Sequence, residues 1–500
     1  MANQHSTALA RFSVNEVVEK IESLKSGKSN GPDGIPYEAL KLGKMLLAPY
    51  ITTLFNQILN VKAIPKEWAK SDIILLYKKG DPAQIGNYRP ISLQPNMYKL
   101  FASCLEQRLA MFTEKYQPPE QAGFRKNFST TDHIHTLNLI MEKYIEHDRP
   151  LYLAFIDYAK AFDSISHTSM WKALHECEVP SETIDLIKDI YYNSKSRVKL
   201  ERQGPEISIC RGVRQGDPLS PRIFIAVLQS IMKTLNWEKK GININGKLLS
   251  NLRFADDIIL FSETASQLQE MIHELNDVSN TIGLELNASK TKVMTNRHTI
   301  PIKVNDNTLE YVQSYIYLGQ QVSFSKTRYE DEVNRRINVT WNKFWSNKET
   351  LKSTLPIKLK KKIMDSCLLP CLTYGCQTWI YNKNIKNKIQ VCQRAMERSI
   401  LNIQRKHRKR NTEIRNTTKI IDALDYCLKL KWKWAGHIAR MDKDKWTQRV
   451  TTWQGPPNKR QRGRPREKWV NEIVRKAGEN WITKAKDRQT WSKMEEAFTR

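Results

Sequence analysis

Two adjacent acids stand between apolar residues in the segment FADDIIL (254–260). The pattern predicts two short buried strands joined by a turn, with Asp256 and Asp257 at the tip of the hairpin. Burying unpaired carboxylates is costly, so such a pair is expected either to take up a proton or to hold a cation. The alternative is a pair of solvated turn aspartates, because Asp is a common turn residue.

A third acid follows another apolar strand. Residues 151–156 form an apolar run that ends at Asp157, which is typical of a strand. If this strand pairs with the predicted hairpin, Asp157 joins Asp256 and Asp257 at one edge of a sheet. Carboxylates are the hard oxygen ligands that magnesium prefers. Two divalent ions about 3.5–4 Å apart support phosphoryl transfer, so this edge is a candidate metal site.

The elements that must position these acids form an irregular mixture of short strands and long helices. No internal repeat and no βαβ array is present, which predicts an α+β fold with a boundary near residue 325. The predicted strands lie within 71–82, 151–156 and, as a hairpin, 196–213, and the predicted helices lie within 13–27, 96–112, 217–235, 329–351, 357–375 and 385–401. The first of these helices opens with Ser13 and Glu16 in capping-box spacing and stops at Gly27.

The charge of the chain predicts a polyanionic partner. Lys plus Arg is 81 and Asp plus Glu is 52, which gives a formal net charge of +29 and favours nucleic acid over a membrane surface. We find neither a signal peptide nor an apolar run long enough to span a bilayer. The 8 cysteines in 500 residues do not form a disulfide scaffold, which indicates a reducing, intracellular compartment. Cys367, Cys371 and Cys376 match no common zinc-finger spacing, and we interpret them as core thiols rather than zinc ligands.

The order of the motifs resembles that of a known family. Five segments occur in the same order as the palm motifs of reverse transcriptases, which they resemble: FIDYAKAFDSISH, RQGDPLSPRIF, FADDIIL, GLELNASKTKVM and YLGQQVS. The version is similar to that of non-LTR (LINE-type) retrotransposons, and more narrowly to the RTE-like group. Upstream, NGPDGIPYEALK, NYRPISLQPNMYKLFASCLEQRL and QAGFRKNFSTTDHI resemble the fingers segments. LPCLTYGCQTW, QRAMERSIL, KWKWAGHIARM and GRPREKW resemble the family's C-terminal part.

The resemblance implies a right-hand polymerase with an antiparallel palm sheet, a helical thumb and a basic C-terminal region. The implied divisions are an N-terminal extension (1–26), fingers and palm (27–323), a helical thumb (324–402) and a basic nucleic-acid-binding region (403–500). Relatives commonly carry an apurinic-type endonuclease before the polymerase. We expect this chain to lack that domain.

The same resemblance implies a role for each matching residue of the palm. Asp157, Asp256 and Asp257 correspond to the catalytic acids that hold two Mg²⁺ ions, with Mn²⁺ as an alternative. Phe162 corresponds to the aromatic gate that excludes a ribose 2′-hydroxyl, the group that separates ribonucleotides from deoxyribonucleotides. The alternative for Phe162 is an ordinary core phenylalanine.

Other matching residues are implied to bind the incoming nucleotide or the primer. The nucleotide-binding residues are Arg89, Phe162, Gln215, Gly216 and Lys290, and the primer-grip residues are Tyr317, Leu318 and Gly319. An arginine suits a triphosphate because its guanidinium bonds phosphate in a bidentate manner. Lys78 or Lys79 is expected to help Arg89, or to lie in a solvated turn. Lys292 competes with Lys290 for the role of proton donor, and a plain surface role is the alternative for both.

The region after residue 325 is expected to bind nucleic acid through its backbone. For Trp341 and Trp345 we favour packing between helices over stacking on bases. The segment RGRPR (462–466) resembles the core of minor-groove hooks that read A·T-rich DNA. The alternative that we favour is a non-specific basic linker.

The sequence therefore predicts an RNA-directed DNA polymerase. Its expected partners are an RNA template, a DNA primer or target DNA and dNTPs, without a membrane, in the nucleus or cytoplasm. The sequence indicates no oligomeric state. The alternative is a catalytically inactive, retrotransposon-derived protein that binds RNA or DNA. An RNA-templated RNA polymerase is disfavoured because Phe162 should exclude ribonucleotides.

Overall fold

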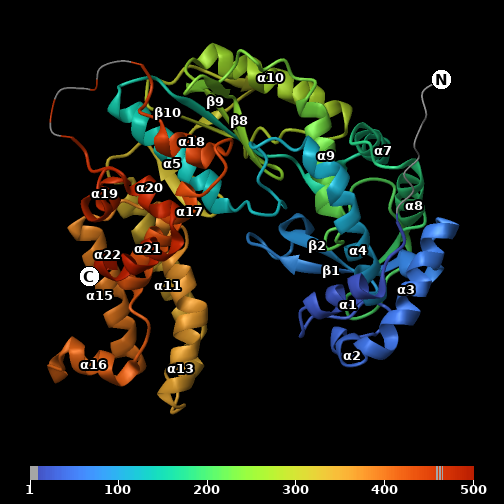
Figure 1. Cartoon of the computed structure of the whole chain (residues 1–500), viewed down its shortest axis with the longest axis horizontal. Helices are drawn as coiled ribbons and strands as arrows, with labels where there is room; N and C mark the ends of the chain where they lie inside the picture. The colour runs from blue at the N-terminus through green and yellow to red at the C-terminus, as the bar shows by residue number, and fades with distance from the viewer. Residues whose placement is uncertain (1–9, 458–459, 461–462, 464, 500) are drawn as a thin grey trace.

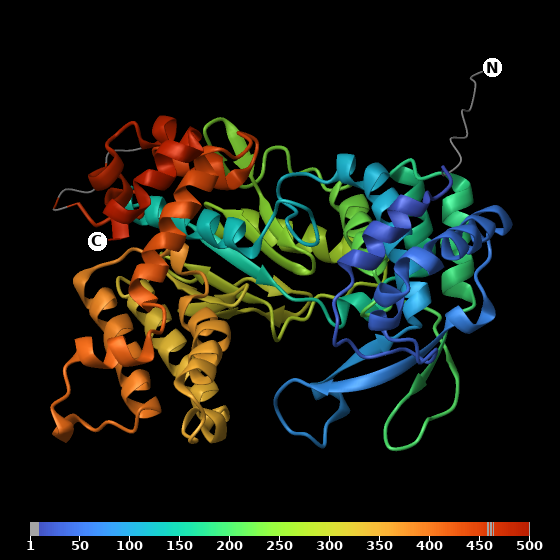
Figure 2. The ribbon, with the colours of Figure 1, turned by 60° about the horizontal axis from the view of Figure 1, so that its bottom comes forward.

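The computed structural model describes residues 10–457, 460, 463 and 465–499. Helices make up 52% and strands 13% of the chain, and this mixture confirms the predicted α+β class. Figures 1 and 2 show a central sheet with helices on both faces.

The central sheet is built from five strands in the order β13-β10-β3-β9-β8. Its strands are β3(Tyr152–Ile156), β8(Asn251–Phe254), β9(Asp257–Ser262), β10(Lys292–Thr295) and β13(Glu310–Tyr311). The pairs β8–β9, β3–β9 and β3–β10 are antiparallel, as predicted, whereas the edge pair β10–β13 is parallel. The hairpin predicted around the two adjacent acids is therefore present, and the strand that ends at Asp157 lies beside it.

Successive residues of these strands enter two different hydrophobic cores, because strand side chains alternate between the faces of a sheet. Ala154 and Leu260 belong to the core that contains α9 and α10. Leu153, Phe155 and Ile259 belong to the core that contains α5 and the C-terminal helices. Burial on both faces explains why the strands are apolar runs in the sequence.

A second sheet has the order β2-β1-β4-β5. Its strands are β1(Lys70–Tyr77), β2(Tyr88–Leu93), β4(Lys195–Val198) and β5(Ile207–Ser208). The antiparallel pair β4–β5 confirms the hairpin predicted within 196–213. Three further hairpins are β6(Ile242–Ile244) with β7(Lys247–Leu249), β11(Lys303–Val304) with β12(Asn307–Thr308), and β14(Ser314–Tyr317) with β15(Gln320–Ser323).

The helices before residue 324 pack around these sheets. They are α1(Val14–Ser23), α2(Tyr37–Leu42), α3(Lys44–Val61), α4(Asn96–Thr113), α5(Thr130–Glu146), α6(Ala161–Ser164), α7(His167–Glu176), α8(Ser181–Tyr192), α9(Ser220–Met232) and α10(Ala265–Thr281). The predicted capping box of Ser13 and Glu16 opens α1, which stabilises the first turn. That helix ends at Ser23, before the glycine at which the sequence placed its end.

After β15 every described element is helical. The helices are α11(Arg328–Ser346), α12(Lys348–Leu351), α13(Ile357–Ile363), α14(Leu369–Thr373), α15(Lys383–Ile400), α16(Asn411–Thr418), α17(Ala423–Ala439), α18(Trp446–Thr452), α19(Asn471–Ala477), α20(Trp481–Lys486), α21(Arg488–Lys493) and α22(Glu495–Thr499). Figure 2 shows α13 and α16 extending on the same side of the central sheet as the β1–β2 and β4–β5 hairpins.

The helices α17 to α22 share one core with α11, α15 and α5. Trp432 and Trp469 are fully buried there, and the ring of Trp432 stacks on Trp491 at 3.9 Å. Trp341 is partly buried in the same core, as predicted, whereas Trp345 leaves 50% of its surface exposed. Arg462 and Arg464 of the RGRPR segment, interpreted above as a basic linker or a minor-groove hook, lie outside the described residues.

The structure also bears on the membrane and zinc predictions. No helix in the described part of the chain is long and apolar enough to cross a lipid bilayer. Of the three cysteines considered as zinc ligands, Cys376 is buried, whereas Cys367 and Cys371 are half-buried.

Candidate active site

The tight turn between β8 and β9 presents the two adjacent acids. Phe254 pairs with Asp257, so Ala255 and Asp256 form the turn itself. Ala255 has φ of 57°, a left-handed conformation that a residue other than glycine adopts only when its surroundings hold it there.

Segment 120–123 holds this turn in place. The side-chain Oε1 of Gln121 accepts hydrogen bonds from the backbone N–H of Gly123 at 2.8 Å and of Ala255 at 3.1 Å. A Cβ atom at Gly123 would lie 2.4 Å from the backbone nitrogen of Ala255, so only glycine fits. The sequence analysis placed this segment in a fingers motif and gave it no role.

The register of β3 and β9 brings the third acid to the same edge. Ile156 pairs with Ile258, so Asp157 and Asp257 follow and precede this pair in neighbouring strands. The Oδ2 atom of Asp157 is buried and has no hydrogen-bond partner. The structure therefore brings together the three acids as the sequence predicted.

Asp157 and Asp256 are half-buried and the side chain of Asp257 reaches solvent, but all three lose hydration to the surrounding protein and repel one another, which governs their ionisation. Burial, followed by the negative charge of Asp157, raises the pKa of Asp256. Burial and the charges of Asp256 and Asp157 raise the pKa of Asp257 to about 6. Burial also raises the pKa of Asp157, although the charges of Lys290 and Lys78 oppose this effect. Three acids that resist ionisation together suit a cation as partner.

Fit to a metal rests on this donor chemistry. Within the described ranges no three His, Cys, Asp or Glu side chains already form a group that could hold a metal ion. The orphaned oxygen of Asp157 and the mutually raised pKa values of the acids nevertheless match hard oxygen ligands that need a divalent cation.

Basic side chains face the acids from two directions. Lys290 Nζ lies 3.8 Å from Asp157 Oδ2. The pKa of Lys78 is lowered by its burial and by the nearby charges of Arg89 and Lys290. The sequence left open whether Lys290 or Lys292 lies at the site. The structure places Lys290 beside Asp157, whereas Lys292 forms an ion pair with Glu310 at 2.7 Å.

Phe162 is a rigid, half-buried ring beside the site. It stacks on Phe224 with ring centroids 4.4 Å apart and planes at 5°, and its edge meets Phe124 at 6.1 Å. Its backbone oxygen accepts a hydrogen bond from Val213 at 2.7 Å. The two interpretations of Phe162 are thus compatible, because one face packs on the core while part of the ring stays exposed.

Gln215 and Gly216 belong to a loop that rests on β2. Gln215 O accepts a hydrogen bond from Ser92 N at 2.9 Å, and Gln215 Nε2 donates to Asp163 Oδ1 at 3.1 Å. Gly216 has φ of 107°, and a Cβ atom there would meet Ser92 O at 3.1 Å. Asp163 is an acid of this site that the sequence analysis did not single out.

A buried charged network supports the same loop. Asp217 Oδ2 accepts hydrogen bonds from Arg214 at 2.7 Å, from the Tyr98 hydroxyl at 2.6 Å and from Gln94 at 3.1 Å. Both charged side chains are at most 2% exposed. The sequence signal for this network is weak, because its members lie far apart in the chain.

The predicted primer grip is the turn of the β14–β15 hairpin. Leu318 and Gly319 have φ of 46° and 79°, as a type I′ turn requires. The Leu318 carbonyl accepts a hydrogen bond from the Tyr374 hydroxyl at 2.7 Å. Tyr317 is 3% exposed, and the charge of Asp257 helps burial to raise its pKa. This turn therefore lies near the acids, but the Tyr317 ring belongs to the core.

Acids at neighbouring strand ends with basic side chains beside them suit the chemistry of phosphoryl transfer. Residues 76–322 match the family described as reverse transcriptase (RNA-dependent DNA polymerase). A transposon-derived protein of Caenorhabditis elegans is 34% identical over 269 residues, which cover 50% of this chain and 96% of that protein. The chain belongs to the reverse transcriptase family, in its non-LTR retrotransposon branch.

Longer relatives and solved structures are also similar. The RNA-directed DNA polymerase from mobile element jockey of Drosophila melanogaster is 27% identical over 421 residues, which cover 79% of this chain and 44% of that protein. The chain thus spans less than half the length of this relative. A structure of telomerase from Candida tropicalis in complex with a fragment of telomeric RNA has a TM-score of 0.40 at 12% identity, covering 84% of this chain and 68% of that one.

Proposed function

We propose that this chain is an RNA-directed DNA polymerase that adds deoxynucleotides from dNTPs to the 3′-hydroxyl of a primer paired with an RNA template. The observation that carries the proposal is the meeting of Asp157 with Asp256 and Asp257 at one sheet edge. Membership of the reverse transcriptase family supports the same activity.

Asp157, Asp256 and Asp257 are the residues that would hold two Mg²⁺ ions, or Mn²⁺ in their place. When bound, such ions lower the pKa of an attacking hydroxyl and stabilise the leaving oxygen. The carboxylates would hold the ions at this sheet edge, beside the place proposed for the primer end.

The basic residues around the acids would bind the triphosphate. Arg89, Lys78 and Lys290 approach from the second sheet and from the segment before β10. Their charges neutralise the phosphates as negative charge builds up on the leaving group. Lys290, 3.8 Å from Asp157, is the proposed donor of a proton to pyrophosphate.

The selectivity for deoxynucleotides would come from Phe162. The stack on Phe224 prevents its ring from turning aside, so a ribose 2′-hydroxyl would collide with it. Gln215 and Gly216 would contact the nucleotide and template, since Gly216 leaves room for a close approach.

Template and primer would be held by other parts of the chain. The Leu318–Gly319 turn would support the primer end. The division into extension, fingers and palm, thumb and basic C-terminal region remains our proposal, with the helices after residue 324 binding the RNA–DNA duplex through its phosphates. We expect this work to take place in the nucleus or cytoplasm. The site keeps all three acids, and no described feature favours an inactive nucleic-acid-binding protein.

Primer extension tests the proposal. The purified chain should incorporate dTTP on a poly(rA) template with an oligo(dT) primer, and EDTA should abolish incorporation. A chain that binds the duplex but incorporates no nucleotide with either Mg²⁺ or Mn²⁺ would sink the proposal.

A further inference from the structure

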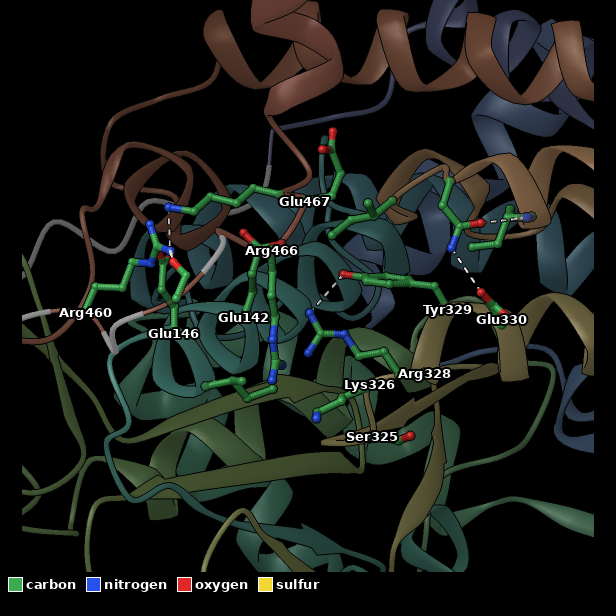
Figure 3. Close-up of a pocket in the computed structure, with 16 residues that line it drawn as sticks. Glu142, Glu146, Ser325, Lys326, Arg328, Tyr329, Glu330, Arg460, Arg466 and Glu467 are labelled. Carbon is green, nitrogen blue, oxygen red and sulfur yellow. Dashed lines mark hydrogen bonds and ion pairs between the residues drawn. The ribbon is translucent and has the colours of Figure 1, made fainter.

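A cavity of about 540 Å³ lies outside the polymerase site. It is lined by the C-terminal end of α5, by the start of α11, by the start of α15 and by the described residues before α19, as Figure 3 shows. None of the residues proposed for polymerisation lines it. Its volume lies within the usual range for small-molecule sites.

Most acids of the cavity wall are already neutralised by neighbours. Glu146, Glu330 and Glu467 each have a basic or amide partner. The pairs are Glu146 with Arg460 and Lys468, Glu330 with Asn382, Asn384 and Lys388, and Glu467 with Arg475. These acids therefore leave little negative charge to offset further cations.

Three cations remain on the wall without such partners. Lys326 and Arg466 form no ion pair with any residue that the structure describes, and both line the cavity together with Arg328, as Figure 3 shows. Arg328 is 9% exposed; its guanidinium donates one described hydrogen bond, to the Tyr329 hydroxyl at 3.3 Å, and lies 4.8 Å from the centre of the Tyr329 ring. Glu142 lies on the same wall, and its charge interacts with Arg328, Lys143 and Lys468, so the acids of the wall, Glu142 included, are outnumbered by its cations. The cavity thus has an excess of positive charge.

The rest of the wall is apolar and includes an aromatic ring. Ile145, Ile380 and Ile385 line it together with Tyr329. Burial raises the pKa of Tyr329, so its phenol stays neutral. The guanidinium of Arg328 lies over the Tyr329 ring, so a flat, uncharged base would lie against the isoleucines and the remaining surface of this neutral ring.

We propose that this cavity binds a nucleotide unit, with its base against Tyr329 and the isoleucines and its phosphate between Lys326, Arg328 and Arg466. Guanidinium groups bond phosphate in a planar, bidentate manner, and the nearly buried Arg328 retains donors for it. The unit has two sources, a free nucleoside monophosphate or one nucleotide of a single strand. The site needs no divalent ion, which separates it from the polymerase site.

Photo-crosslinking in EDTA tests the proposal. The full chain is irradiated with 4-thiouridine 5′-monophosphate or with a single-stranded RNA that carries one 4-thiouridine, and the modified peptides are mapped by mass spectrometry. We expect a crosslink on the peptide that contains Tyr329. The concentration for half-maximal crosslinking should rise about tenfold in Lys326→Gln and in Arg466→Gln, a loss of about 1.4 kcal/mol of binding free energy.

Lys383→Gln is the matched control, because Lys383 is exposed beside the cavity without lining it. It should leave the crosslink unchanged. Lys326 is itself exposed, so its replacement should not alter the melting temperature. A crosslink with the monophosphate alone would identify a free nucleotide as the ligand. A crosslink with the RNA alone would identify one nucleotide of a single strand as the ligand. Either result would support the site. No crosslink at Tyr329, an unchanged half-maximal concentration in both variants, or equal competition by inorganic phosphate would overturn it.

Discussion

The ring of Phe162 is held between the core and the site, and this position determines its expected effect on sugar selection. Phe162→Val keeps an apolar side chain but removes the ring that stacks on Phe224. We expect the preference for dTTP over UTP, measured as the ratio of kcat/KM values, to fall about tenfold or more.

Phe324→Val is a suitable control, since Phe324 is partly buried in the other core. It should lower stability without changing the preference for dTTP. A Phe162→Val enzyme that still rejects UTP as well as the unchanged chain does would assign the ring to packing alone.

The ionised carboxylate of Asp257 is expected to lower the free energy of unfolding of the metal-free chain. Its pKa is raised to about 6, and an acid whose pKa is raised on folding costs stability above its folded pKa and none below its unfolded pKa. In EDTA at pH 8, Asp257→Asn should therefore melt about a degree or more above the unchanged chain. The gain should shrink as the pH falls through about 6 toward about 4.

Differential scanning calorimetry across this pH range measures the effect. Asp306→Asn, at an exposed turn, provides a control that should show no such gain. A destabilised Asp257→Asn at pH 8 in EDTA would mean that the acids do not repel one another.

The β8–β9 hairpin depends on segment 120–123, a distant part of the chain that holds the turn in place and is called the brace below. Gly123→Ala would push a methyl group to 2.4 Å from the backbone of Ala255, so the turn and its acids must move. Overpacking of this kind costs about 1–3 kcal/mol, and a displaced metal site should lower kcat more than it changes KM. Gly86→Ala, where a Cβ meets no atom within 4 Å, should change kcat little. Equal kcat values for the two variants would contradict the role of the brace.

The sequence predicted the hairpin and the strand before Asp157 because both are apolar runs that end in acids, and such runs have a local signature. It also predicted α1, through its capping box, and the β4–β5 hairpin. The brace had no such signature, since Gln121 and Ala255 are 134 residues apart. The Arg214–Asp217 network was missed for a related reason: Tyr98 and Gln94 reach it from another helix and loop, and polar contacts of this kind have no period in the sequence.

The charge of the whole chain should govern its binding to duplexes. The formal net charge is +29, and α13 carries the exposed lysines Lys358 and Lys362 on a part that extends from the body (Figure 1). Replacing both with Gln should reduce the slope of log K against log salt for RNA–DNA duplex binding by about 1–2. Fluorescence anisotropy at several salt concentrations measures this slope.

Lys172→Gln/Lys239→Gln, an equal loss of charge at exposed positions of α7 and of the turn after α9, is the control and should leave the slope nearly unchanged. If both pairs changed the slope equally, binding would depend on net charge and not on α13.

The basic composition of the C-terminal helices does not reveal that several of their tryptophans are buried in a core. Their lysines and arginines predicted a basic binding region, yet Trp432 and Trp469 are fully buried in a core shared with the central sheet. The positive charge of this region could be predicted from the sequence, but the residues against which each tryptophan packs could not. The same holds for the cavity beside Tyr329, whose walls come from four separate parts of the chain.

Primer extension by three matched proteins tests the central claim most directly. The unchanged chain, Asp256→Asn/Asp257→Asn and the exposed-turn control Asp306→Asn are compared on poly(rA) and oligo(dT) with dTTP and Mg²⁺, and duplex binding is measured in parallel. We predict that the double variant loses incorporation about a hundredfold or more while it binds the duplex as well as the control does. Incorporation by the double variant at the rate of the control would contradict the assignment of these acids as the catalytic site.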